Sequence, residues 1–283
     1  LTGKMRTEYT IASTGALLDA SERNYARKLI DRLNIPSRLF CELAQPGEIL
    51  GELLPGVLEE TGELCARVIN IASHDTASAV LAVPAFGEDF VYISSGTWSL
   101  LGTEIPEPII NDKTLSFNFT NESGVGGTIR LLRNIMGLWL LQESRRQWER
   151  EGELISFGDL TKMAEAARPL ACVIDPDDSR FSAPGDLPKR IAEYCRETGQ
   201  HIPENKGETV RCILDSLALR YRRTVEQINE IRGKKTKHLH IVGGGVQNKL
   251  LCRLSADACG IPVYAGPVEA TAIGNILVQL MAL

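Results

Sequence analysis

The segment that says most about the architecture is His238-Leu239-His240-Ile241-Val242-Gly243-Gly244-Gly245-Val246-Gln247-Asn248. The run from His238 to Val242 is typical of a buried strand, and residues 248–259 are predicted to form a helix. Consecutive glycines between a strand and a helix let the backbone approach a ligand closely. Gly243, Gly244 and Gly245 therefore indicate either a phosphate or nucleotide site or an ordinary tight turn, and the residues alone leave both interpretations open.

Two common nucleotide motifs are absent from this segment and from the rest of the sequence. The dinucleotide fingerprint G-x-G-x-x-G would need glycine where Asn248 stands, and no Walker A sequence occurs. A Rossmann-type oxidoreductase is therefore disfavoured.

A second turn of small residues, Ser94-Ser95-Gly96-Thr97, lies between two β runs in residues 90–102. Its backbone N–H groups could form a concave anion nest, and a β-hairpin with a glycine turn explains the same residues. Two such turns after β runs are what a nucleotide phosphate clamp requires from one domain.

Further along, strands alternate with helices, which favours α/β layers. The longest predicted helix is Glu208 to Arg232, with one apolar stripe at spacings of three and four. A domain boundary is expected near Phe86. The other predicted helices are residues 22–33, 135–150, 159–167, 188–196 and 268 onward, and the other predicted strands are residues 65–72, 126–133 and 261–265.

Length and charge bound the class of protein. The chain has 283 residues, and single cores stop growing at about 250–300 residues, so two domains are expected. The net charge of −5 offers no basic field for a phosphate backbone, which makes nucleic acid an unexpected partner. No apolar run reaches the roughly 18 residues of a membrane helix and no signal peptide opens the chain, so we expect no membrane partner and a cytoplasmic location.

Metal-binding signals are weak. The seven cysteines contain no C-x-x-C pair and are scattered, so reduced thiols are expected in place of a disulfide framework or zinc knuckle; they are Cys41, Cys65, Cys172, Cys195, Cys212, Cys252 and Cys259. His238 and His240 lack a third ligand nearby. The run from Asp175 to Asp178 is expected to make Asx turns because it lacks the remaining ligands of a calcium loop. No residue is assigned to a metal.

The pair His74-Asp75 follows a short β-type run and precedes a helical stretch. An aspartate at such a place can cap the helix. Alternatively, it can act as a general base that takes the proton of an alcohol attacking phosphorus. The local sequence does not decide between these roles.

Four blocks in one order carry a resemblance to a known family. They are Ala72-Ser73-His74-Asp75-Thr76-Ala77-Ser78-Ala79-Val80, Ser94-Ser95-Gly96-Thr97-Trp98-Ser99-Leu100, Asn134-Ile135-Met136-Gly137-Leu138-Trp139-Leu140-Leu141-Gln142, and Val242-Gly243-Gly244-Gly245 with Asn248. Together they resemble the FGGY family of carbohydrate kinases, along nearly the whole chain. The forms of the second and third blocks are most similar to the family's kinases of L-rhamnulose.

The resemblance implies an α/β fold of the actin-like ATPase type. Such proteins have two ribonuclease-H-like domains, each with a mixed sheet flanked by helices, and bind ATP and sugar between them. Residues 1–85 are then expected to be the C-terminal portion of the N-terminal, sugar-binding domain, the remnant of a second similar domain. Residues 86–283 are expected to be the C-terminal, nucleotide-binding domain.

The resemblance also implies roles for individual residues. Asp75 matches the catalytic base, His74 and Thr76 flank it at the sugar site, and Asn134 matches a position near the substrate. The positions that match the ATP site are Gly96, Thr97, Gln142, Gly243, Gly244, Gly245 and Asn248.

The implied reaction, in rhamnose metabolism, transfers the γ-phosphoryl group of ATP to the 1-hydroxyl of L-rhamnulose, with Mg²⁺ bridging phosphate oxygens. The implied partners are the sugar and ATP, and the sequence says nothing of the oligomeric state. Two alternatives stay open: another FGGY kinase acting on a different ketose or polyol, and a non-catalytic fragment that binds nucleotide or sugar.

Family members begin with a strand and a glycine/serine phosphate loop carrying an acidic residue that helps to hold the metal. Residues 1–30 do not resemble that loop. We therefore expect the chain to be a piece of a longer protein, which alone retains weak nucleotide binding without useful turnover.

Overall fold

The computed structural model describes residues 1–62, 66–85 and 87–283. The chain forms two compact units: unit 1 holds residues 1–84, 104–132 and 269–283, and unit 2 holds residues 85–103 and 133–268. The predicted boundary at Phe86 and the cysteine at Cys65 lie outside the described residues. None of the helices in the described ranges is long and apolar enough to cross a membrane.

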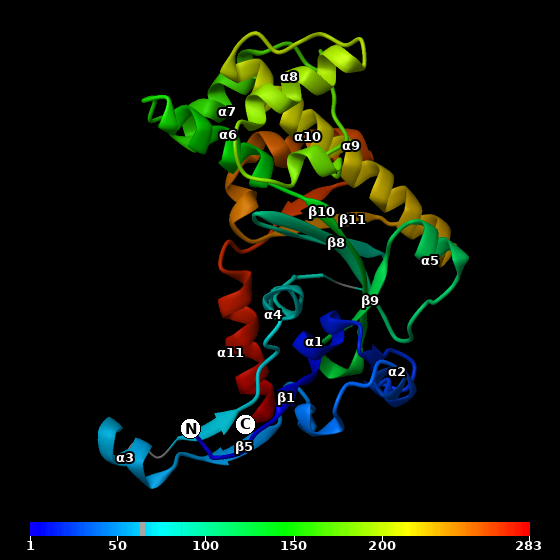
Figure 1. The fold of residues 1–283 in the computed structure, drawn as a ribbon, viewed down its shortest axis with the longest axis vertical. Coiled ribbons are helices and arrows are strands. Elements are labelled where there is room, and N and C mark those ends of the chain that lie inside the picture. The colour runs from blue at the N-terminus through cyan, green and yellow to red at the C-terminus, as the bar shows by residue number, and fades with distance from the viewer. Residues whose placement is uncertain (63–65, 86) are drawn as a thin grey trace. The chain divides into compact units, whose positions relative to one another are not determined.

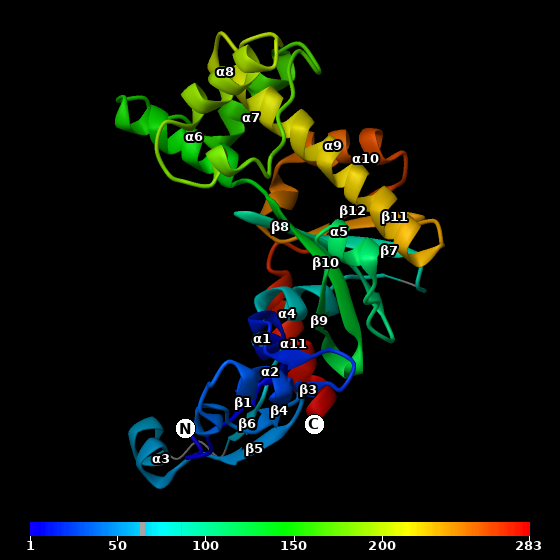
Figure 2. The same ribbon diagram turned by 45° about the vertical axis from the view of Figure 1, so that its right-hand side comes forward.

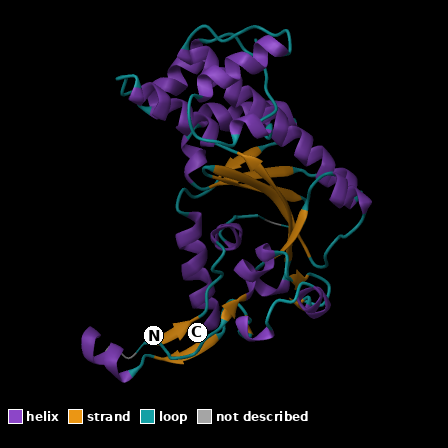
Figure 3. Cartoon of the chain, viewed as in Figure 1, coloured by secondary structure: helices purple, strands orange, loops and turns teal. Residues whose placement is uncertain are grey.

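A mixed sheet forms the centre of unit 2 (Figure 3). Its strand order is β12-β11-β7-β8-β10-β9, and β9 with the first half of β10 belongs to unit 1. Strand β11 runs parallel to β12 and β7, whereas β7 is antiparallel to β8 and β10 to β9. The bounds are β7 Phe90–Ser95, β8 Trp98–Ile105, β9 Thr120–Ser123, β10 Ile129–Met136, β11 His238–Val242 and β12 Val263–Ala265. The predicted mixed sheet is thus confirmed.

Helices complete unit 2: α6 Trp139–Arg150, α7 Phe157–Ala166, α8 Leu187–Glu197, α9 Lys206–Arg232 and α10 Lys249–Cys259. Helix α9 confirms the predicted long helix and begins two residues earlier, where the Asn205 side chain accepts the N–H of Glu208. Its apolar stripe is buried, and the Tyr221 hydroxyl lies 2.7 Å from Ser99 Oγ on β8. Helix α10 lies beside α9 (Figure 2). The core of unit 2 therefore lies between the sheet and α9.

Unit 1 contains short strands in pairs, β1–β4 parallel and both β2–β3 and β5–β6 antiparallel. They are β1 Thr7–Glu8, β2 Leu18–Asp19, β3 Asn24–Tyr25, β4 Leu43–Ala44, β5 Ile49–Glu52 and β6 Arg67–Ile69. Its helices are α1 Tyr9–Ala12, α2 Arg27–Arg32, α3 Pro55–Thr61, α4 Asp75–Leu81, α5 Asp112–Ser116 and α11 Ala270–Ala282. Short 3-10 helices along the chain are Ser13–Gly15, Ser37–Leu39, Val125–Gly127, Ser179–Phe181 and Gly244–Gln247.

Helices α4 and α11 of unit 1 lie side by side (Figure 1). A Cβ atom at Gly274 of α11 would overlap the carbonyl of Ser78 on α4. Glycine at position 274 is therefore a packing requirement, because any side chain would push the two helices apart.

Two sequence expectations were wrong in detail. The predicted helix at residues 22–33 begins only at Arg27, because Asp19 Oδ1 accepts the N–H groups of Ser21 and Glu22 (2.9 and 3.1 Å) and turns the chain into the β2–β3 hairpin. The helix predicted from Ile135 begins at Trp139, since Ile135 and Met136 complete β10. In both cases pairing with a neighbouring strand overrides a local helical pattern.

Candidate functional site

A pocket of about 590 Å³ lies in unit 2. This volume is within the roughly 300–1,000 Å³ of typical small-molecule sites. Residues from both glycine turns, α6, α7 and the start of α10 surround it: Gly96, Leu138, Leu141, Gln142, Phe157, Gly158, Thr161, Glu165, Gly244, Gly245, Gln247, Asn248, Lys249 and Leu250. The structure thus brings together Gly96, Gln142, Gly244, Gly245 and Asn248 from the residues singled out in the sequence.

Parallel pairing of β7 with β11 explains why the two turns meet. Ser94 pairs with Val242, so both strands end at the same edge of the sheet and their turns follow there. The two turns are in close contact, because a Cβ atom at Gly245 would overlap the Ser95 hydroxyl. Gly243, which follows β11, also lies close to Ser95, since a Cβ atom at Gly243 would lie 2.8 Å from the Ser95 carbonyl oxygen. The glycines therefore serve a close backbone approach at the mouth of the pocket.

The first turn is joined to α6. The Thr97 hydroxyl donates to Gln142 Oε1 at 3.2 Å, and the Trp139 N–H donates to the Thr97 carbonyl at 3.0 Å. Thr97 is not among the described residues that line the pocket. Its hydrogen bond nevertheless holds the side chain of Gln142, which does line the pocket. The Gly96 N–H is used within the β7–β8 hairpin, where it donates to the Trp98 carbonyl at 2.8 Å. The hairpin expected as the structural explanation of this turn is therefore present, and that amide is not aimed at a ligand.

Apolar and charged residues that were not predicted as site residues complete the pocket. Leu138, Leu141 and Phe157 supply apolar surface, and Glu165 and Lys249 supply charge. A base or ribose could use the apolar part, and phosphate oxygens the lysine. Leucines and phenylalanines at helical spacing are ordinary core residues in a sequence, so only the fold reveals them as pocket lining.

The His74-Asp75 turn belongs to unit 1 and starts α4. Asp75 is the first helical residue, and its side chain is 77% exposed. Its Oδ1 accepts the Thr76 N–H at 2.6 Å, and Thr76 itself is buried. His74 occupies the N-cap position, so Asp75 is not the N-cap residue, but its carboxylate still satisfies an N–H group of the first helical turn. Its exposed carboxylate is open to a hydroxyl group.

Asn134 lies on β10 in unit 2 and is exposed. It is outside the described set of residues lining the pocket. A role near the substrate stays a prediction for this residue.

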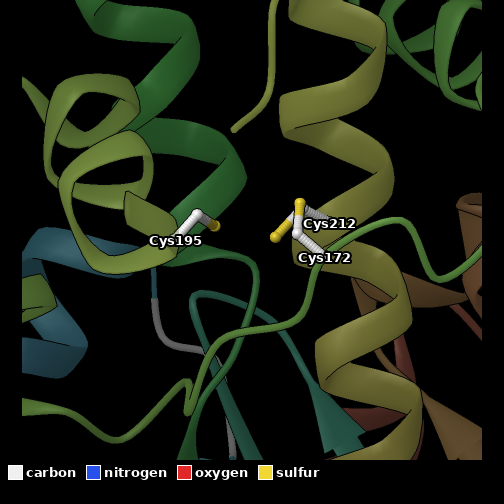
Figure 4. A group of neighbouring side chains, drawn as sticks. All are labelled: Cys172, Cys195 and Cys212. Carbon is white, nitrogen blue, oxygen red and sulfur yellow. The ribbon is translucent and has the colours of Figure 1, made fainter. Parts of the chain in front are cut away.

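Three cysteines that are far apart in the sequence meet in unit 2 (Figure 4). The sulfur atoms of Cys172, Cys195 and Cys212 lie within 4.8 Å of one another, and all three residues are buried and unpaired. The Cys212 thiol lowers the pKa of Cys195 to about 7, whereas the Cys172 and Cys195 thiols raise the pKa of Cys212 above its ordinary range. Thiols at this spacing suit soft cations or disulfide exchange, and none of the three lines the pocket.

The described residues that line the pocket offer Mg²⁺ few protein ligands of the kind it prefers. Magnesium prefers carboxylate, phosphate and water oxygens, and thiols are soft ligands that do not suit it. Glu165 is the one carboxylate among the described residues that line the pocket.

The predicted Asx turns are confirmed, since Asp175 Oδ1 accepts the Asp177 N–H at 3.1 Å and Asp178 Oδ1 accepts the Arg180 N–H at 2.9 Å.

Family models match almost the whole chain. The model of the FGGY family of carbohydrate kinases, N-terminal domain, matches residues 1–82, and that of the C-terminal domain matches residues 91–283.

Several curated relatives have the name rhamnulokinase. The chain is 48% identical over 281 residues to that of Bacteroides thetaiotaomicron, covering 99% of this chain and 57% of the relative. It is 42% identical over 282 residues to that of Bacillus subtilis, covering 100% of this chain and 58% of the relative. The chain therefore spans somewhat more than half the length of the curated relatives it matches.

Solved structures show the same fold. A ligand-bound xylulose kinase from Lactobacillus acidophilus matches with a TM-score of 0.72 at 15% identity, over 100% of this chain and 56% of that one. A glycerol kinase from Plasmodium falciparum with ADP matches with a TM-score of 0.71 at 16% identity, over 99% of this chain and 55% of that one. These similarities confirm the expected actin-like ATPase fold.

Proposed function

Because the chain belongs to the FGGY family of carbohydrate kinases, we propose that the whole encoded protein phosphorylates L-rhamnulose. The γ-phosphoryl group of ATP goes to the 1-hydroxyl of the sugar, giving L-rhamnulose 1-phosphate and ADP. The names of the relatives that are 42–48% identical to this chain support this substrate. Sugar and ATP are then the partners, and we infer a cytoplasmic location from the sequence.

The observation that carries the proposal is the unit 2 pocket. Its volume of about 590 Å³, its position beside two glycine turns and its mixed apolar and polar lining suit a nucleotide. We assign the nucleotide to this pocket, with Gly96, Gly244, Gly245, Gln142 and Asn248 in contact with it. Thr97 positions the Gln142 side chain through its hydrogen bond, and Gly243 lets the second glycine turn lie close to Ser95.

The sugar end of the reaction is assigned to the His74-Asp75-Thr76 turn and to Asn134. As the 1-hydroxyl oxygen attacks the γ-phosphorus, its proton passes to the Asp75 carboxylate, and the bond to the bridging oxygen breaks to release ADP. Mg²⁺ supplies charge neutralisation at the phosphates in such reactions, and no residue of this chain is assigned to hold it. The same proposal takes residues 1–85 as the end of the sugar-binding domain and residues 86–283 as the nucleotide-binding domain.

A phosphorylation panel tests the proposal. The whole encoded protein is given ATP, Mg²⁺ and L-rhamnulose, D-xylulose, D-ribulose or glycerol, and ADP is measured by a coupled assay. We expect the highest kcat/KM with L-rhamnulose; a higher value with another acceptor would establish a different FGGY kinase, and ATP binding without transfer to any of them would establish a non-catalytic protein.

A separate experiment measures the ATP binding and the activity of the 283-residue chain alone. We expect weak ATP binding by calorimetry and no measurable phosphorylation of L-rhamnulose. Turnover by the chain that disappears in Asp75→Asn would contradict the second expectation.

A further inference from the structure

A buried ion cluster lies behind the His74-Asp75 turn in unit 1. Arg130 of β10 is fully buried and pairs across the strands with Glu122 of β9, which is 5% exposed. The Arg130 guanidinium donates through Nε to the Ser123 carbonyl at 2.9 Å, and its Nη2 lies 3.3 Å from Glu122 Oε2. Its Nη1 has no hydrogen-bond partner among the described residues. A buried charge of this kind is costly unless ion pairing and hydrogen bonds offset its loss of hydration.

The same guanidinium reaches the histidine of the turn. Arg130 Nη2 lies 2.9 Å from His74 Nδ1. Because an arginine side chain can only donate hydrogen bonds, Nδ1 must be the acceptor, and the single proton of the neutral ring is then on Nε2.

Burial and the charges around the His74 ring together disfavour a second proton on it. Burial and Arg130 lower the pKa of His74, while Glu122, Asp75 and Glu8 act in the opposite direction. A second proton would have to enter at Nδ1, which lies 2.9 Å from the guanidinium and 3.5 Å from Glu122 Oε2, and burial together with Arg130 outweighs the carboxylates. The geometry and the charge balance thus agree on a neutral ring.

The protonated nitrogen faces the carboxylate assigned as the base. His74 Nε2 lies 3.6 Å from Asp75 Oδ1, which is too long for a hydrogen bond. The N–H group therefore remains able to donate to Asp75 after a small movement, or to a substrate oxygen placed beside both groups. The His74 side chain is thus a hydrogen-bond donor, and the Asp75 side chain is an acceptor.

Two residues from the start of the chain hold the backbone of the turn. The His74 N–H donates to Thr10 Oγ1 and the Ser73 N–H donates to Glu8 Oε2, both at 3.1 Å. The Thr10 hydroxyl in turn donates to Glu8 Oε2 at 2.6 Å. The turn is fixed from outside its own helix, so the ring orientation is set by long-range contacts.

We propose that Arg130 is a positioning residue that fixes His74 as a neutral Nε2–H donor and so leaves Asp75 as the only proton acceptor of the turn. Glu122 balances the buried guanidinium charge. The catalytic meaning of this arrangement rests on the proposed function, in which Asp75 accepts the proton of the sugar hydroxyl. The tautomer itself does not depend on that function.

The tautomer can be measured directly in the 283-residue chain. Two-bond ¹H–¹⁵N correlation spectra report which ring nitrogen is protonated, and the chain has four histidines, so His74→Gln identifies the signals. We expect His74 to show a protonated Nε2 and an unprotonated Nδ1. In Arg130→Met, which keeps the length but removes charge and donor, we expect a mixture of tautomers and a higher titration midpoint. Arg133→Met on the same strand, whose side chain contacts Asp177 instead, is the matched control and leaves His74 unchanged.

Each result supports or overturns the proposal. A wild-type ring protonated on Nδ1, or an Arg130→Met ring that keeps the single Nε2–H tautomer and its titration midpoint, overturns it. If Arg130→Met does not fold, Arg130→Lys decides the matter, because a lysine is also an obligate donor: retention of the Nε2–H tautomer supports the proposal, and an Nδ1–H tautomer overturns it.

Kinetics of the whole encoded protein separate this inference from the proposed function. Arg130→Met should lower kcat, leave KM for ATP unchanged and move the acid limb of the kcat profile to higher pH, and Arg130→Lys should recover part of the loss. Equal losses in both variants with an unshifted profile would make Arg130 merely structural. Full activity of Asp75→Asn would refute the proposed base while leaving the tautomer result intact.

Discussion

Adding one methyl group to the second glycine turn gives a sharp test of the pocket's construction. In Gly245→Ala the new Cβ would overlap the hydroxyl of Ser95, a residue of β7 that is 2% exposed. Overpacking of this kind costs about 1–3 kcal/mol. For a domain of about 150–250 residues, each kcal/mol lowers Tm by roughly 2–4 °C. We therefore expect a Tm several degrees below wild type.

The neighbouring glycine is the control. A Cβ at Gly244 would meet no atom within 4 Å, so Gly244→Ala should leave Tm within about 1 °C of wild type, the range of a surface substitution. Gly244 nevertheless lines the pocket, so this variant should weaken ATP binding measured by calorimetry. The two positions thus separate stability from binding.

A Gly245→Ala chain that melts like wild type would contradict this expectation, because the two turns would then not be in tight contact. An equal loss of stability in Gly244→Ala would also contradict it, since a general backbone effect of glycine would explain both. Unaltered ATP binding in a stable Gly244→Ala chain would remove the nucleotide from this pocket.

Three further outcomes follow from the structure. Asp75→Asn in the whole encoded protein should reduce kcat for L-rhamnulose about 100- to 10,000-fold, the usual contribution of a general base, with KM for ATP unchanged in steady-state assays. Cys212→Ala should raise the pKa of Cys195 from about 7 toward that of an ordinary thiol, because the Cys212 thiol is the main cause of the lowering; thiolate absorbance at 240 nm against pH measures it. The ammonium groups of Lys234 and Lys237 contact the Asp89 carboxylate and lower its pKa to about 2. The folded pKa is below the unfolded value of about 3.9, so this carboxylate stabilises the fold above about pH 4 and the effect is lost as pH falls toward 2. Asp89→Asn should therefore flatten acid unfolding between those values, followed by circular dichroism.

Local patterns were sufficient for several elements of unit 2. The apolar stripe of α9, the strand β11 and the glycine turn after it follow from periodicity and glycine chemistry, and the structure has them where they were expected. The start of α2 and the end of β10 could not be found in this way. The start of α2 follows from the β2–β3 hairpin and the end of β10 from its place beside β8 in the sheet, and apolar periodicity reports neither pairing.

Some residues of the candidate site can likewise be found from the sequence, whereas others are brought together only by the fold. Glycines and the His74-Asp75 pair stand out in the sequence because their residue types are uncommon in plain secondary structure. The contact between His74 and Arg130 joins residues 56 positions apart, and the three buried cysteines meet across 40 positions. Such groups depend on tertiary folding, so the sequence offers no signal for them beyond a count of residue types.

The most direct test of the central claim is the stoichiometry of the reaction. The whole encoded protein is incubated with ATP, Mg²⁺ and L-rhamnulose and followed by ³¹P NMR, with Asp75→Asn in parallel. We expect one L-rhamnulose 1-phosphate for each ADP and almost none with the variant. ADP with free phosphate in place of sugar phosphate, or equal sugar phosphate from both proteins, would contradict it.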